Sequence, residues 1–159
     1  MVEVYFKNEQ SKYLITPALK KAVRRAVRAT LEYIDVRRMT EVSVTFTDNE
    51  KIRVLNREYR QKDTPTDVLS FPLIDWDADT DEGMDDGSSF FPLVLGDIVI
   101  SLEKAHAQAI EYDQTLIREV SFLAIHSTLH LLGYDHETSA EDEKEMFGIQ
   151  DIIIEMLGI

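Results

Sequence analysis

The sequence predicts an α+β fold. Strand and helix patterns follow one another in the order β-α-β-α-β-β-α-α-α, which mixes few strands with more helices. The chain has 159 residues, enough for a substantial core, and it shows neither internal repeats nor linker-like segments. We therefore expect a single domain over residues 1–159.

A strand and a long helix are predicted first. Val2–Lys7 alternates apolar and polar residues, as a strand does. Thr16 and Pro17 suit the N-cap and first helical position of a helix that runs to about Asp35. Its inner side is apolar apart from one threonine and comprises Leu19, Val23, Ala26, Val27, Thr30, Leu31 and Ile34.

Two more strands follow, with a helix between them. Glu41–Thr47 alternates again, and Asp48 is expected to cap a helix that runs to about Tyr59. Pro65 forbids helix continuation in the next loop. Val68–Phe71 then reads as a short strand that ends at Pro72.

An acidic segment, Asp75–Ser89, separates the third and fourth strands. It holds seven acidic residues and no basic ones, so it should repel itself and be mobile. Three of its aspartates fall at positions 1, 3 and 5 of a calcium loop. However, Thr80 stands where that loop needs glycine and Asp86 where it needs glutamate. We expect no metal site in this segment.

Leu93–Ser101 predicts the fourth strand, with an irregularity near Gly96. Ser101 caps a helix from Leu102 to about Tyr112, on which His106 is expected to be exposed and not to bind metal.

The last two predicted helices follow a break near Asp113. One, from about Gln114 to Leu132, is apolar nearly all round and should be buried. Ser139 and Asp142 form a capping box for the other, which runs to about Leu157. Its expected inner residues are Met146, Ile149, Ile153 and Leu157.

Three of the four histidines lie on or just after the buried helix. His126 and His130 are four residues apart, so they project from one helix face. Gly133 can adopt positive φ and end the helix, so that the chain turns back and His136 approaches the pair. Three such imidazoles predict a zinc site with one open position.

The spacing matches the metzincin protease frame H-E-x-x-H-x-x-G-x-x-H, except that Ser127 replaces the glutamate that acts as general base. A histidine pair at this spacing is often only structural. Here, however, the burial of the helix and the position of the third histidine favour metal ligation. The absence of this glutamate indicates that the metal site acts on a substrate other than a peptide.

Charge is distributed unevenly. The net charge is −13, but residues 1–62 carry +6 and residues 63–159 carry −19. This asymmetry suggests two different surfaces, although the basic residues of the first helix, taken alone, favour a solvated face over a phosphate-facing one. The absence of cysteine excludes disulfides and thiolate metal sites. No apolar run approaches the roughly 18 residues of a membrane span, and no signal peptide is evident, so we expect a cytoplasmic protein.

Three segments of the chain resemble the YbeY family of bacterial endoribonucleases, which are also called rRNA maturation factors. H-S-T-L-H-L-L-G-Y-D-H resembles the family motif H-G-x-L-H-L-x-G-Y-D-H, with Ser127 in place of glycine. Leu55–Pro72 and Leu95–Ser101 resemble two other family segments, and together the three cover about a quarter of the chain. The resemblance implies a four-stranded mixed sheet packed against helices, with the metal helix arranged as in zincins.

The resemblance also implies a function. It is zinc-dependent cleavage of single-stranded RNA in rRNA maturation, at the 3′ end of 16S rRNA, and in ribosome quality control. One zinc ion per chain would be held by His126, His130 and His136. Arg60 matches the family arginine implicated in RNA cleavage, so Arg60 and His126 are the expected catalytic residues. Expected partners are rRNA together with ribosomal proteins or assembly factors, and no membrane.

Residue chemistry leaves alternatives open. Arg60 could clamp phosphate with its guanidinium fork, or simply pair with Glu58 or Asp63. Asp67 and Asp135 could orient ligating imidazoles, or cap turns. Two other functions also remain. One is a metalloprotease, which Ser127 opposes. The other is a non-catalytic ribosome-assembly factor with structural zinc, which normally needs a fourth protein ligand.

Overall fold

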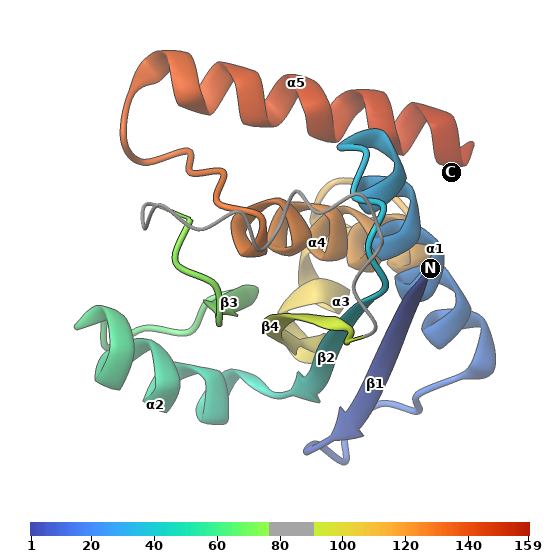
Figure 1. Ribbon diagram of the computed structural model, residues 1–159. Coiled ribbons are helices and arrows are strands. Elements are labelled where there is room, and N and C mark those ends of the chain that lie inside the picture. Colours follow the sequence, from blue (N-terminus) through green and yellow to red (C-terminus); the bar gives the residue numbers. More distant parts are fainter. Residues whose placement is uncertain (77–90) are drawn as a thin grey trace.

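The computed structural model describes residues 1–76 and 91–159 and shows an α+β fold (Figure 1), as predicted. Four strands form a single mixed sheet, and five helices of the described residues pack around it. The elements in chain order are β1 (Val2–Asn8), α1 (Pro17–Tyr33), β2 (Thr40–Thr47), α2 (Asn49–Arg60), β3 (Val68–Pro72), β4 (Leu93–Ser101), α3 (Leu102–Glu111), α4 (Leu116–Leu131) and α5 (Ala140–Leu157).

The sheet has the strand order β1-β2-β4-β3, with β3 at one edge. β1, β2 and β4 run parallel, whereas β3 is antiparallel to β4. The predicted irregularity near Gly96 is present, because the β2–β4 register skips Leu95. Gly96 has φ 144°, and a Cβ there would overlap the carbonyl oxygen of Phe71 on β3. Only glycine therefore lets the edge strand approach β4 this closely.

The two faces of the sheet bury different clusters. Ile98 and Ile100 of β4 point into the main core, which also contains side chains of α1, α4 and α5. Val99, between them in sequence, points the other way and packs with Ile52 of α2 and Leu69 of β3. α4 and α5 thus lie on one side of the sheet and α2 on the other (Figure 1).

The ends of α4 determine where its histidines lie. The helix begins two residues later than predicted, because Thr115 is its N-cap and accepts the backbone N–H of Arg118. At the other end Gly133 has φ 95°, as predicted, and Tyr134 N–H donates to the Leu129 carbonyl at 3.0 Å. Trp76 packs on Gly133 and donates from Nε1 to the Leu131 carbonyl at 2.8 Å. The end of α4 is therefore firmly held.

One sequence expectation is corrected. His106 is half-buried rather than exposed, because its ring stacks on Tyr13 with centroids 3.8 Å apart, and burial lowers its pKa. The prediction that Asp75–Ser89 is mobile and holds no calcium falls almost wholly on residues 77–90, which lie outside the described part. In the part of the chain that is described, no helix combines the length and apolar character needed to cross a membrane.

Glu119, near the start of α4, is a carboxyl group with only 3% of its surface exposed. Its Oε1 accepts a hydrogen bond from Gln108 Nε2 at 2.6 Å, and Gln114 donates to the other oxygen. Burial raises the pKa of Glu119; the bond from Gln108 opposes the rise and the charge of Asp67 adds to it. The folded protein therefore keeps this proton to a higher pH than the unfolded chain does.

This raised pKa predicts a pH-dependent stability difference between the wild type and Glu119→Gln, which cannot titrate. As pH falls from about 7 to the ordinary value of 4.5, the folded wild type takes up a proton before the unfolded chain. The unfolding free energy of the wild type should therefore rise relative to that of the variant. Urea denaturation of both proteins across this range measures the difference. A difference that is independent of pH would contradict the argument.

Candidate metal centre

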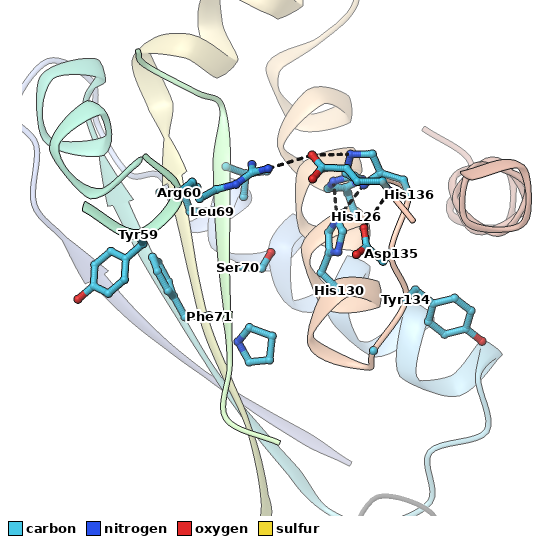
Figure 2. A pocket seen from close by; sticks show the side chains of 14 residues that line it. Tyr59, Arg60, Leu69, Ser70, Phe71, His126, His130, Tyr134, Asp135 and His136 are labelled. Carbon is cyan, nitrogen blue, oxygen red and sulfur yellow. Dashed lines mark hydrogen bonds and ion pairs between the residues drawn. The ribbon is translucent and has the colours of Figure 1, made fainter. Parts of the chain in front are cut away.

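Three imidazoles converge at the C-terminal end of α4. His126 and His130 project from its last two turns, and His136 approaches from the turn before α5 (Figure 2). His130 Nε2 lies 3.1 Å from His126 Nε2 and 3.1 Å from His136 Nδ1. The three candidate ligand atoms all lie within 4.8 Å of one another. Two nitrogens on one tetrahedral zinc are about 3.3 Å apart, so the cluster fits a single ion.

Burial favours the neutral form of His126 and His130. It lowers the pKa of His130 to about 4, and the adjacent His126 and His136 act in the same direction. Burial also lowers the pKa of His126, although a hydrogen bond with Gln150 opposes the change. Neutral imidazoles can bind a metal near pH 7 without first losing a proton. The electrostatics of the cluster therefore suit a cation.

Each imidazole also has a second neighbour. His126 Nδ1 lies 2.7 Å from Gln150 Oε1, and His130 makes a hydrogen bond with the backbone of Tyr134. His136 Nε2 lies 3.7 Å from Glu137 Oε1. The sequence reading missed Gln150 because it lies 24 residues beyond His126, on another helix. One signal in the sequence could have identified it: Gln150 lies one turn after Met146, which places a polar residue on the inner side of α5.

Asp67 and Asp135 make their hydrogen bonds to groups other than the three imidazoles. Asp135 Oδ1 accepts the N–H of Glu137 at 2.9 Å, as a turn-capping aspartate does. Asp67 Oδ1 accepts the N–H of Val68 at 2.8 Å, while Gln108 donates to its Oδ2. The charge of Asp67 acts to raise the pKa of His126, and the charge of Asp135 acts to raise that of His130, against the larger effect of burial. They act on the histidines through charge.

Arg60 reaches toward the histidines from the last residue of α2. Gln61 follows it in a left-handed conformation and ends the helix there. The Nη2 of Arg60 lies 2.9 Å from Glu137 Oε1, and the arginine side chain is 38% exposed. Neither partner suggested by the sequence, Glu58 or Asp63, is the one observed. Instead, Asp63 pairs with Arg53 at 2.9 Å.

Arg60 and the three histidines line the same cleft, of about 520 Å³. One wall is the edge strand β3, and the opposite wall is the end of α4 with the following turn (Figure 2). The arginine therefore faces the cluster of imidazoles across the cleft, and the carboxylate of Glu137 contacts both Arg60 and His136. An anion could occupy this cleft with the guanidinium on one side and a metal ion on the other.

Ser127 lies outside this constellation. Its side chain is fully buried, and its hydroxyl has no hydrogen-bond partner among the described residues. It is not one of the described residues that line the cleft. The position that holds the general base in metzincins is thus occupied by a small, enclosed hydroxyl.

The fold and the cleft define an α+β protein with a three-histidine group that could hold a metal ion beside an arginine. Comparison with known proteins identifies the family. The model of the family described as Endoribonuclease YbeY matches residues 5–158, and this chain belongs to the YbeY family.

Individual relatives agree with this assignment. Proteins named Endoribonuclease YbeY from Oceanobacillus iheyensis and Acetivibrio thermocellus are 57% and 42% identical to the chain. The first match covers 75% of each chain, and the second covers 99% of this chain and 98% of the other. The solution structure of TM1509 from Thermotoga maritima is similar, with a TM-score of 0.60 and 27% identity. That match covers 96% of this chain and 87% of that one.

Proposed function

We propose that this chain is a zinc-dependent endoribonuclease that cleaves single-stranded RNA, with residues 1–159 acting as one hydrolase domain. The observation that carries the proposal is the position of Arg60, which lines the same cleft as the three clustered histidines. The name of the relatives, Endoribonuclease YbeY, supports RNA as the substrate. His126, His130 and His136 are the proposed zinc ligands, with one ion per chain.

The residues of the cleft have separate tasks in this proposal. Zinc would supply positive charge beside the scissile phosphate. The guanidinium of Arg60 would grip two phosphate oxygens and stabilise the charge that grows on them during cleavage. Because Arg60 now pairs with Glu137, the phosphate must exchange with that carboxylate before the arginine can bind RNA.

The biological setting that we propose is supported by the resemblance to the YbeY family. It is maturation of the 3′ end of 16S rRNA and ribosome quality control in the cytoplasm, with ribosomal proteins or assembly factors as further partners. The basic N-terminal segment, residues 1–62, carries +6 and would attract RNA to a protein of net charge −13. Binding should therefore weaken as salt rises.

A metalloprotease is the second candidate, and one observation favours it. The cleft is lined by β3, an edge strand, and an extended peptide could pair with such an edge. The enclosed Ser127 opposes this function, because no carboxylate occupies the position of the protease base.

RNA cleavage by metal-loaded protein tests the proposal. Labelled single-stranded RNA, duplex RNA and an unfolded protein should be offered in parallel, with and without a chelator. We expect cleavage of single-stranded RNA alone, abolished by the chelator. Zinc-dependent cleavage of the unfolded protein without cleavage of RNA would favour the protease. A folded, zinc-loaded protein inert toward both would favour the third function, a non-catalytic assembly factor.

Replacing Glu137 by glutamine should strengthen RNA binding, because it frees Arg60 from its ion pair. An exposed pair is worth about 0.2–1 kcal/mol, so the KM for RNA should fall by no more than about fivefold. Steady-state kinetics on single-stranded RNA measure the change. Glu58→Gln is the matched control, since it removes an exposed carboxylate of α2 that does not line the cleft, and it should leave KM unchanged. A raised KM in Glu137→Gln would show that the carboxylate instead assists the substrate.

A further inference from the structure

Gln150 of α5 connects that helix to the candidate metal centre. Its side chain is fully buried, and its Oε1 lies 2.7 Å from Nδ1 of His126. α5 presents Met146, Ile153 and Ile154 to the core, so a glutamine on this inner side is chemically out of place. The partner of its carbonyl oxygen is the imidazole of a candidate ligand, His126.

The direction of this hydrogen bond determines the tautomer of His126. A carbonyl oxygen only accepts, so Nδ1 of His126 must carry the hydrogen. In the neutral ring Nε2 then has the free lone pair, and Nε2 is the atom that lies 3.1 Å from His130 Nε2 in the cluster. With the amide reversed, Nδ1 would accept and Nε2 would point a hydrogen at the cluster. Only the first arrangement allows His126 to bind a metal.

The amide nitrogen of Gln150 lowers the stability of the fold. Gln150 Nε2 is buried and has no hydrogen-bond partner among the described residues. A buried amide donor without a partner costs roughly 1–3 kcal/mol. An apolar side chain of similar size would avoid that cost, so stability alone does not explain a glutamine here. Function at the metal centre does explain it.

We propose that Gln150 is a positioning residue that holds His126 in the Nδ1–H tautomer, with its Nε2 lone pair directed at the metal. The inference rests on the metal centre of the proposed function. Loss of such an outer hydrogen bond typically weakens metal binding about 10–100-fold. Gln150→Met should show this loss. Gln150→Glu keeps an acceptor in the same place and should bind zinc at least as tightly as the wild type, because a charged acceptor makes a stronger bond.

The stability of the metal-free protein distinguishes positioning from a structural role. Gln150→Met removes the buried donor that lacks a partner but also leaves Nδ1 of His126 without its acceptor. The two changes oppose each other, so the unfolding free energy should stay close to that of the wild type. Gln114→Met is the matched control, because Gln114 donates to Glu119 away from the cleft. It should lose stability and keep wild-type zinc affinity.

Two measurements test the inference. Competition with a chromophoric chelator gives the zinc affinity of each variant, and NMR of the imidazole nitrogens gives the tautomer of His126 in the metal-free wild type. We expect Nδ1–H in the wild type and a population of Nε2–H in Gln150→Met. Wild-type zinc affinity in Gln150→Met, or an Nε2–H tautomer in the wild type, would overturn the inference. If the wild type bound no zinc, the proposed function would fail, and the NMR measurement would still decide whether Gln150 sets the tautomer.

Discussion

Replacing His130 by alanine is expected to remove both the bound zinc and the cleavage of RNA. Among the three imidazoles His130 is central, since its Nε2 lies 3.1 Å from a ring nitrogen of each of the other two. Two remaining imidazoles cannot hold a zinc centre that normally needs three protein ligands. Zinc content should fall from about one ion per chain to nearly none, and the rate of RNA cleavage should fall by orders of magnitude.

Elemental analysis and cleavage assays on purified protein measure this result. His106→Ala is the matched control, because His106 stacks on Tyr13 and does not line the cleft. It should retain zinc and activity. Chelation of the wild type should reproduce the loss of activity in His130→Ala. Wild-type zinc content in the alanine variants of His126, His130 and His136 would exclude this ligand set.

Much of the fold could be predicted because local chemistry determines it. Thr16, Asp48 and Ser101 each cap a helix through their own side chain, and the structure confirms all three. Successive side chains of a strand point to opposite faces of the sheet, so the alternation of apolar and polar residues shows which side chains face the core. The convergence of the histidines was predictable for the same reason, since helix periodicity and the turn at Gly133 bring together residues close in sequence.

The missed contacts depend on packing between distant segments. Gln150 meets His126 only because α5 lies against α4, and Arg60 meets Glu137 across 77 residues of sequence. Local spacing carries no information about such pairs, which is why the two ion-pair partners that the sequence suggests for Arg60, Glu58 and Asp63, are both close to it in sequence. His106 was misjudged similarly, since the ring that covers it belongs to Tyr13. The spacing of Met146, Gln150 and Ile153 could have shown that Gln150 faces inward.

Replacing Arg60 by alanine is expected to slow RNA cleavage by about 10²–10³-fold while leaving zinc content unchanged. This range is typical for the loss of one group that stabilises transition-state charge. Arg60 lies across the cleft from the histidines, and its partner is Glu137. That exposed ion pair contributes at most about 1 kcal/mol, so the variant should remain folded. Arg60→Lys should recover only part of the rate, because an ammonium group is a point charge and not a fork.

Arg57→Ala is the matched control for Arg60→Ala, since it removes an arginine one turn earlier on α2. Arg57 lies 3.9 Å from Asp63 and does not line the cleft, so its loss should leave the cleavage rate close to that of the wild type. Initial rates on labelled single-stranded RNA, with zinc content measured on the same samples, provide the comparison. Equal losses in Arg57→Ala and Arg60→Ala would indicate general attraction of RNA by α2. Undiminished cleavage by zinc-loaded Arg60→Ala would remove the arginine from the mechanism, because phosphate could not then depend on its guanidinium.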